Sequence, residues 1–426
     1  MTFKCGLDIL RKNYPNLKDI KEGDPIINDQ NDLVEESIRA VKKMNSTCLL
    51  IQGPPGSGKT YTSAKIILSL LKDNKRVGIT SNSHKAINNL LYQIEKFALE
   101  EKFFFKGMKK SSKDEDKLKG EIIEDISGRM REFPSQYLLH AGTAWLFSDP
   151  RWTLKMDYLF VDEAGQVSLA NTLAVSTSTK NIILIGDQMQ LSQPIQGIHS
   201  GDSGKSALDF LLESYDTIPK SRGIFLGITR RLNEKICNYI SSSFYESRLK
   251  SHPITKKRSV TLELKKIRNE GIFYLPVNHQ DCTQKSDEEA KIIKDYIKKI
   301  IGKSCNENNK QSEISGKDIM VVAPFNMQVN NLKKIIDQKD IRIGTIDKFQ
   351  GQESKIVFIS MTSSDPDNLP RHKEFFFSRN RLNVAISRAQ CVTVILFNPK
   401  LLLANCQKIN EVRLINNFCK LLKYKV

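Results

Sequence analysis

Eight residues early in the chain have the types and spacing of a phosphate-binding loop. Between an apolar run at 48–51 and a helical pattern stand Gly53, Pro54, Pro55, Gly56, Ser57, Gly58, Lys59 and Thr60. Glycines let successive backbone N–H groups curl around phosphate oxygens, and a helix start adds its positive dipole end. An ordinary Gly/Pro turn explains the full pattern less well in this strand, loop and helix context. We therefore predict that Lys59 contacts nucleotide phosphates and that the Thr60 hydroxyl binds Mg²⁺.

Two adjacent carboxylates end a second apolar run. Residues 158–161 predict a buried strand, and Asp162 and Glu163 follow it directly. Downstream of a phosphate loop, the first carboxylate of such a pair usually holds Mg²⁺ and the second activates water for attack on the γ-phosphate. We predict these roles for Asp162 and Glu163. The alternative is a charge cluster at a helix start, which the upstream loop makes less favourable.

Polar residues also follow other predicted strands of the first half. Ser81 and Asn82 come after a strand at 76–80, where hydroxyl and amide groups suit either a phosphate backbone or a helix N-cap. A strand at 181–185 runs into the polar nonapeptide 186–194, which turn chemistry alone explains poorly. Four parallel strands with polar ends predict a doubly wound sheet with its ligands at the carboxyl edge.

The elements that must position these residues fall into two α/β halves. We place the first domain at 1–218, with a Lys/Glu-rich insertion at about 97–135 that we expect to be a solvated helical segment or a mobile arm. Strand and helix alternation begins again after Pro219, without a second glycine-rich loop. The second domain is therefore placed at 219–426.

Composition favours a soluble protein with an acidic polymer as partner. The 426 residues carry a formal net charge of +18 with 27% charged residues. The 8 cysteines form no C-x-x-C pair or Cys/His cluster, so neither a zinc module nor an iron–sulfur cluster is indicated. No apolar stretch reaches the length of a signal or membrane span. We expect an intracellular location, in the cytoplasm or the nucleus or nucleoid, without a membrane partner.

Between Pro25 and Asn398 these segments resemble superfamily 1 helicases, in the branch of the nonsense-mediated-decay and nuclease-associated helicases. Within that branch, residues 142–147 and 345–388 look most like helicase domains fused to RecB-type nucleases. The resemblance implies two tandem RecA-like P-loop domains with parallel sheets flanked by helices. It also implies ATP and Mg²⁺ as cofactors and movement along single-stranded DNA or RNA, in the 5′ to 3′ direction.

The resemblance extends to single residues. Gln30 matches an adenine-reading glutamine and Gln190 a γ-phosphate sensor. Arg231 and Arg388 match arginines that reach the γ-phosphate from the second domain, and Arg230 next to Arg231 leaves open which of the two acts. Two positions near the γ-phosphate and ribose are matched by Gly351 and Glu353. Positions that touch the nucleic-acid backbone are matched by Ser81, Asn82, Thr143, Asn326 and Thr345.

Two other functions compete with an ATP-dependent helicase or translocase. A ring-forming P-loop ATPase that remodels protein or nucleoprotein complexes would take its arginine from a neighbouring subunit, and would leave residues 350–353 and 381–388 unexplained. A binding module with a degenerate nucleotide site is disfavoured by intact Lys59, Asp162 and Glu163. We expect a monomer. Because the sequence shows no cysteine-rich or nuclease segment, we expect a nuclease or other accessory protein as a further partner.

Overall fold

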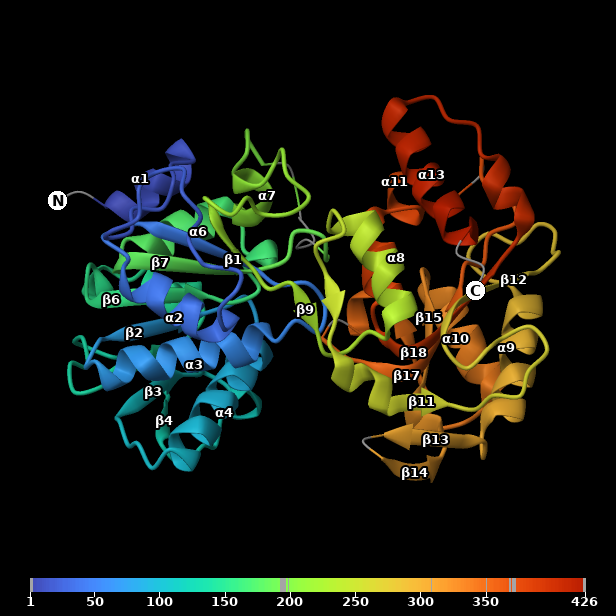
Figure 1. Ribbon diagram of the computed structural model, residues 1–426, viewed down its shortest axis with the longest axis horizontal. Coiled ribbons are helices and arrows are strands. Elements are labelled where there is room, and N and C mark those ends of the chain that lie inside the picture. The colour runs from blue at the N-terminus through green and yellow to red at the C-terminus, as the bar shows by residue number, and fades with distance from the viewer. Residues whose placement is uncertain are drawn as a thin grey trace. The chain divides into compact units, whose positions relative to one another are not determined.

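The structure is a computed structural model, and it describes residues 3–191, 197, 199–307, 309–349, 351–367, 369 and 373–423 (Figure 1). The chain divides into two compact units. Unit 1 takes in Met1–Pro54, Gly58–Gln188 and Ser192–Leu226. Unit 2 takes in Pro55–Ser57, Met189–Leu191 and Gly227–Val426. Each unit has its own hydrophobic core and is described by itself.

An eight-stranded sheet forms the centre of unit 1, in the order β4-β3-β5-β2-β6-β7-β1-β8. All of its neighbouring strands are parallel. The strands are β1 (Cys48–Gln52), β2 (Val77–Thr80), β3 (Gly107–Lys110), β4 (Ile123–Ile126), β5 (Leu139–Ala141), β6 (Met156–Val161), β7 (Thr179–Gly186) and β8 (Gly223–Phe225). The central strands read as nearly unbroken apolar runs because helices cover both of their faces.

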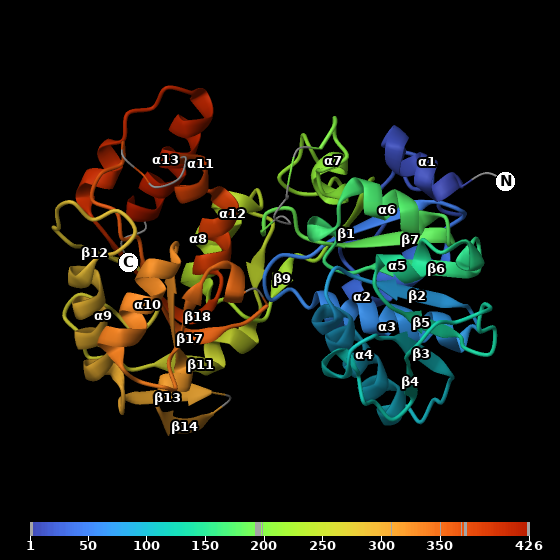
Figure 2. The same ribbon diagram turned by 180° about the vertical axis from the view of Figure 1, so that it is seen from behind.

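Helices cover both faces of this sheet, as Figures 1 and 2 show from opposite sides. The helices α2 to α4 lie on one face and α5 and α6 on the other. Ile66, Ile67 and Leu70 of α3 are buried in the core. The helices of unit 1 are α1 (Lys4–Arg11), α2 (Leu33–Lys42), α3 (Lys59–Lys72), α4 (His84–Glu100), α5 (Ala144–Phe147), α6 (Leu169–Ser176) and α7 (Ala207–Leu211).

The Lys/Glu-rich segment at 97–135 belongs to the sheet, so the expectation of a helical insertion or mobile arm is wrong. After α4 ends, the segment adds β3 and β4 to one edge, with a short 3₁₀ turn between them. Met108 and Ile123 are buried, and even Lys109 is enclosed, with its ammonium donating to the carbonyl of Asp116. Burial lowers the pKa of Lys109. The prediction was based on the number of charged residues in the segment. It overlooked the few apolar side chains whose burial is enough to pack two short strands onto the sheet.

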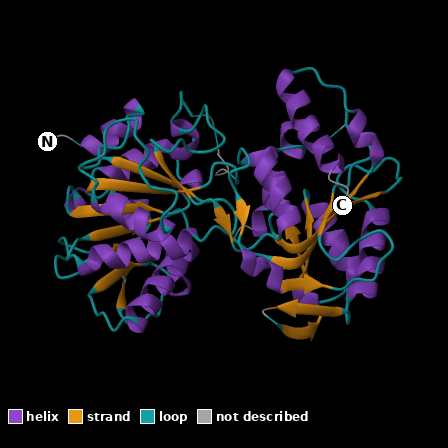
Figure 3. Ribbon diagram, in the orientation of Figure 1, coloured by secondary structure: helices purple, strands orange, loops and turns teal. Residues whose placement is uncertain are grey.

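Unit 2 repeats the architecture with a five-stranded parallel sheet, in the order β12-β18-β17-β15-β16 (Figure 3). Its strands are β12 (Gly271–Pro276), β15 (Ile319–Ala323), β16 (Arg342–Thr345), β17 (Ser354–Ser360) and β18 (Ala389–Phe397). Its helices are α8 (Glu234–Phe244), α9 (Asp287–Ile300), α10 (Asn326–Ile336), α11 (Lys373–Phe376), α12 (Arg379–Ile386) and α13 (Ile409–Lys423). The prediction of two tandem RecA-like α/β domains with parallel sheets is confirmed.

Two small sheets complete unit 2. One is an antiparallel sheet of β11 (Arg258–Val260), β13 (Ser304–Glu307) and β14 (Lys310–Glu313). The other pairs β9 (Ile228–Thr229) with β10 (Lys250–Ser251). Among the described residues of both units, no helix is long and apolar enough to cross a membrane.

Candidate active site

The phosphate loop between β1 and α3 has the backbone that its glycines allow. β1 ends at Gln52, and α3 begins at Lys59. Gly56 and Gly58 have φ of +72° and +83°, a left-handed conformation that residues with a Cβ rarely adopt. Lys59 Nζ donates a hydrogen bond to the Gly53 carbonyl at 2.8 Å. The ammonium is therefore tied to the first residue of its own loop.

The carboxylate pair lies at the end of β6, close to Lys59. Asp162 is buried, and burial, reinforced by the negative charge of Glu163, raises the pKa of Asp162 to about 7. The nearby ammonium of Lys59 opposes this rise in pKa. Glu163 has φ +52°, an uncommon left-handed conformation for a residue other than glycine. The structure therefore brings together the predicted lysine and the predicted carboxylates.

The strand ends that carry these groups are joined by short backbone contacts. Gly53 N donates to the carbonyl of Gly186, at the end of β7, at 2.9 Å. A Cβ on Gly165 would lie 3.0 Å from the Asp187 carbonyl oxygen, and a Cβ on Gly186 would lie 2.9 Å from Gly165 N. Glycine is required at both positions by this close approach. The ends of β1, β6 and β7 thus form one continuous edge.

Gln190 lies just beyond this edge, in the segment Met189–Leu191, and its side chain is buried. Its neighbours Ser192, Gln193 and Pro194, which belong to the predicted polar nonapeptide, lie outside the described residues. Gln188 is used structurally, since its Nε2 donates to the Asp216 carbonyl at 2.9 Å.

Gln30 lines a pocket of ≈ 530 Å³ in unit 1. Pro25, Ile26 and Ile27 supply apolar lining. Two of the lysines that line the pocket are paired with carboxylates of the same lining, Lys43 with Asp19 and Lys220 with Asp29. The loop that carries Gln30 is held by Glu36, whose carboxylate accepts from Asn28 N at 2.8 Å and from Asn31 Nδ2 at 3.1 Å. Because apolar walls and the amide side chains of Asn28 and Gln30 suit a flat heteroaromatic ring, the pocket has the composition expected of an adenine site.

Ser81, Asn82 and Thr143 share a neighbouring part of the same edge. β5 and β2 are adjacent, and Gly142 N donates to the Ile79 carbonyl at 3.0 Å. Ser81 is buried, and Asn82 Nδ2 donates to the carbonyl of Gln166. Thr143 is the N-cap residue of α5. These three residues therefore lie at the ends of neighbouring strands.

Trp145 is a residue that sequence reasoning missed. It lies two positions after Thr143, and 88% of its surface is exposed, whereas Trp152 is 1% exposed. An indole of this size is seldom left in water without a function, because its burial is strongly favourable. The only available signal was its closeness to Thr143, since exposure is not visible in a sequence.

Arg231 in unit 2 is joined to Glu353. Its Nε pairs with Glu353 Oε2, and its Nη1 donates to the Ser387 carbonyl at 3.4 Å. Gln390 Nε2 donates to the other carboxylate oxygen of Glu353 at 2.9 Å. Burial alone would raise the pKa of Glu353, but Arg231 and Gln390 outweigh it and hold the pKa below its usual range. Arg230 is an exposed neighbour, and its carbonyl accepts from Arg258.

Arg388 is enclosed within unit 2. The helix α12 ends at Ile386, and the Arg388 side chain just beyond it is only 1% exposed. Its Nε donates to the Val384 carbonyl at 3.0 Å, and its Nη1 donates to the Gln352 carbonyl at 3.1 Å. Gly351, with φ +78°, lies in the turn that supplies this second carbonyl, and its neighbour Gln350 lies outside the described residues. The arginine is therefore fixed to the segment that carries Glu353.

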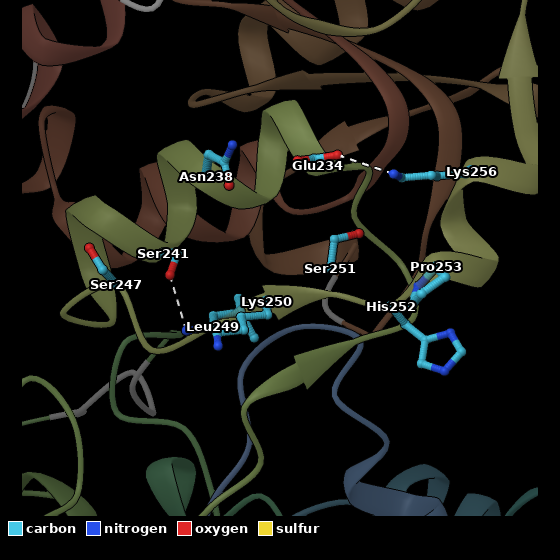
Figure 4. A pocket seen from close by; sticks show the side chains of 10 residues that line it. All are labelled: Glu234, Asn238, Ser241, Ser247, Leu249, Lys250, Ser251, His252, Pro253 and Lys256. Carbon is cyan, nitrogen blue, oxygen red and sulfur yellow. Dashed lines mark hydrogen bonds and ion pairs between the residues drawn. The ribbon is translucent and has the colours of Figure 1, made fainter.

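Asn326 and Thr345 meet at the carboxyl edge of the second sheet. β15 and β16 are paired with Ala323 opposite Thr345, and Asn326 begins α10 directly after β15. Both residues line a pocket of ≈ 330 Å³. A separate pocket of ≈ 540 Å³ lies between α8 and the segment 247–256 (Figure 4), and none of the predicted site residues lines it.

Comparisons with known proteins agree with this geometry. Two family models, both described as an AAA domain, match residues 37–195 and 204–400. The chain is 24% identical to the DNA polymerase alpha-associated DNA helicase A of Schizosaccharomyces pombe, over 82% of the chain and 60% of that protein. It is 24% identical to the DNA replication ATP-dependent helicase/nuclease dna2 of the same organism, over 84% of the chain and 27% of that protein.

A third relative is the ATP-dependent helicase NAM7 of Saccharomyces cerevisiae, which is 26% identical over 84% of the chain and 40% of that protein. The chain thus spans 60% or less of the length of these three relatives. The two family models have matches in both units, and the matched ranges include the phosphate loop, Arg231 and Arg388. The chain belongs to the superfamily 1 helicases, in the branch that contains nuclease-associated helicases and NAM7.

Proposed function

We propose that the chain is a nucleic-acid-dependent ATPase that moves along single-stranded DNA or RNA, 5′ to 3′, and separates strands. The observation that carries the proposal is the edge of unit 1, where the ammonium of Lys59 lies near the buried carboxylate of Asp162 beside a phosphate loop, with Glu163 next to Asp162. Unit 2 supports it with a second RecA-like sheet that has arginines in place of a second phosphate loop. We propose a monomer that works with an accessory protein.

Use of ATP follows from the AAA-domain matches and from relatives named as ATP-dependent. In the proposed site Lys59 contacts the phosphates, Glu163 accepts the proton of the attacking water, and Gln190 senses the γ-phosphate. Gln30 reads the adenine in its pocket, and Gly351 and Glu353 lie near the ribose and γ-phosphate. We propose Arg231, rather than Arg230, as the first arginine, because its side chain is positioned by Glu353. Arg388 is the second arginine.

Mg²⁺ fits the donors at this edge. Asp162 is a buried carboxylate with a raised pKa, so a divalent cation would stabilise its charged form, and Thr60 offers a hydroxyl oxygen. Both are hard oxygen ligands of the kind that Mg²⁺ prefers. When bound, Mg²⁺ would neutralise charge on the phosphates.

The single strand is proposed to follow the carboxyl edge of each sheet. In unit 1, Ser81, Asn82 and Thr143 would contact its backbone, with the exposed ring of Trp145 beside them. In unit 2, Asn326 and Thr345 would do the same from one pocket. Hydroxyl and amide groups at strand ends suit phosphate oxygens, and an exposed indole suits a base.

The test is the ATPase rate with no nucleic acid and with matched DNA and RNA oligonucleotides. We expect a rate that rises with single strands, and separation of duplexes that carry a 5′ single-stranded tail. Duplexes with a 3′ tail are the matched control for direction. An ATPase rate that no single strand changes would reject the proposal, since a remodelling ATPase would show that behaviour.

A further inference from the structure

The pocket at the carboxyl edge of the unit 2 sheet contains more than the two expected backbone-contact residues. Its volume is ≈ 330 Å³, at the small end of the range for ligand sites. Besides Asn326 and Thr345, its lining includes Met327, Asp347, Phe375 and Arg381. The family likeness gave no role to these four residues.

Arg381 is held in a defined orientation inside this pocket. Its Nη1 donates to Asp347 Oδ2 at 3.2 Å, and its Nη2 donates to Asp347 Oδ1 at 3.3 Å. The guanidinium carbon lies 4.0 Å from the centre of the Phe375 ring. A forked ion pair fixes the plane of a guanidinium, and an aromatic face supports it from one side. The Arg381 side chain is 19% exposed and lines the pocket, so part of it is open to a ligand there.

The charges in the pocket argue against a phosphate as the ligand of Arg381. Asp347 compensates the charge of Arg381, and its own carboxylate, which is 50% exposed, would repel a phosphate. Three other parts of the pocket lining are flat or apolar. They are the guanidinium plane of Arg381, the Phe375 ring on which it lies, and the Met327 side chain, which is 54% exposed. Proteins bind unpaired bases by stacking them on aromatic rings and on arginine planes.

We propose that this pocket receives one base of the single strand, stacked on the layer formed by Arg381 and Phe375, with Met327 as a further apolar contact. Asn326 and Thr345 then hold the adjoining backbone. Arg381 is thus a base-binding residue, and Asp347 is a positioning residue that keeps its plane in place. The inference rests on the proposed function, because it requires a single strand along this edge.

The test compares two strands of equal length and charge, one of deoxythymidines and one with every base removed. Arg381→Ala should bind the base-bearing strand about tenfold more weakly than the parent does, since stacking contributes roughly 1–3 kcal/mol per base. Binding of the abasic strand should be unchanged. The slope of log affinity against log salt should also be unchanged, whereas loss of a phosphate contact would reduce it by about 0.7.

Two further variants complete the design. Met327→Ala removes an exposed side chain with little risk to folding, and should weaken binding of the base-bearing strand only. Arg268→Ala is the matched control, because it removes an exposed arginine that precedes β12 and so lies at the amino edge of the same sheet. Arg268→Ala should prefer the base-bearing strand over the abasic strand as strongly as the parent does.

The outcomes separate the inference from the function. If Arg381→Ala and Met327→Ala weaken both strands equally, or if the salt slope falls by about 0.7, the pocket binds backbone and the inference is overturned. If Arg381→Ala does not fold, Met327→Ala decides the question by itself. If that variant prefers the base-bearing strand over the abasic strand as strongly as the parent does, the inference is overturned. A parent protein that binds no single strand rejects the proposed function, whereas a parent that binds with unaffected variants rejects only the base pocket.

Discussion

The two units hold their charged candidate residues in different electrostatic states. At the edge of unit 1, Asp162 is buried next to a like charge, and its pKa is raised to about 7. In unit 2, Arg381 is paired with Asp347 just after β16, at the carboxyl edge, and Arg231 is paired with Glu353 just before β17, at the amino edge. A bound cation would therefore stabilise the charged form of Asp162 in unit 1. The two arginines of unit 2 already have carboxylate partners within their own unit. If Arg231 is to contact a phosphate, its ion pair with Glu353 must weaken.

The largest expected effect removes the loop lysine from unit 1. Lys59→Ala should lower ATP hydrolysis by at least about 10³-fold and should weaken ATP binding, because the charge that meets the phosphates is gone. Glu163→Gln is the matched comparison, since it should stop turnover while ATP stays bound. Steady-state ATPase and equilibrium nucleotide binding measure both variants. Parent-like turnover in Lys59→Ala would show that the loop is not the nucleotide site.

The next effect concerns the buried arginine of unit 2. Arg388→Ala should lower hydrolysis by about 10³-fold while ATP binding persists, since Lys59 and Thr60 at the start of α3 are unchanged. It should also destabilise unit 2 by roughly 2–4 kcal/mol, because the Val384 and Gln352 carbonyls lose their buried donor. ATPase assays together with thermal unfolding separate the two effects, and Arg388→Lys serves as the variant that keeps the charge.

Mixing Arg388→Ala with Lys59→Ala distinguishes an arginine that acts within its own chain from one supplied by a neighbouring subunit. If Arg388 acts on the nucleotide of its own chain, each variant still lacks one essential residue, and the mixture does not recover ATPase activity. Recovered ATPase would contradict the proposed monomer and favour a ring-forming enzyme.

Asp162 predicts a pH dependence that belongs to unit 1. Its pKa is raised from 3.8 to about 7, so between these values the folded protein holds a proton that the unfolded chain has lost. The free energy of unfolding should therefore fall as the pH rises through this window, and the stabilisation from this group is fully present only below the unfolded pKa. Asp162→Asn should remove that part of the slope.

Tryptophan fluorescence during denaturant unfolding measures this dependence in the absence of nucleotide, because both tryptophans, Trp145 and Trp152, lie in unit 1. Asp295→Asn, a change of an exposed carboxylate on α9 of unit 2, controls for the removal of one charge. Equal slopes for the parent and Asp162→Asn between pH 4 and pH 7 would mean that Asp162 ionises normally.

The smallest effect is expected at the edge of unit 1 beside Thr143. Single strands should quench the exposed Trp145, whereas Trp152, which lies edge-on to Phe133 at 5.5 Å, should report little. Trp145→Phe should lose the quenching and keep most of the affinity, and Trp145→Ala should weaken binding by about tenfold. Fluorescence titration with the same oligonucleotides measures both. Undiminished quenching in Trp145→Phe would place the strand elsewhere.

Local pattern alone was enough to predict the parallel sheets and the strand ends at which Lys59 and Asp162 lie close together. The phosphate loop stands between a strand and a helix because its glycines allow φ values of +72° and +83°, and that requirement is written in eight consecutive residues. The pair Asp162 and Glu163 follows an apolar strand for the same local reason. Where the signal was global composition, as in the charged segment 97–135, the prediction of its structure failed.

Pairings between distant residues and the exposure of single side chains were decided only by the tertiary structure. Arg231 and Glu353 are 122 positions apart, and nothing near either one specifies the other. Trp145 is exposed and Trp152 is buried, although both are tryptophans in the same short region. The sequence by itself determined which backbone segments become strands, helices and tight turns, because these depend on neighbouring residues. Which side chains meet or face water depends on how the segments pack, and packing joins residues that the chain keeps far apart.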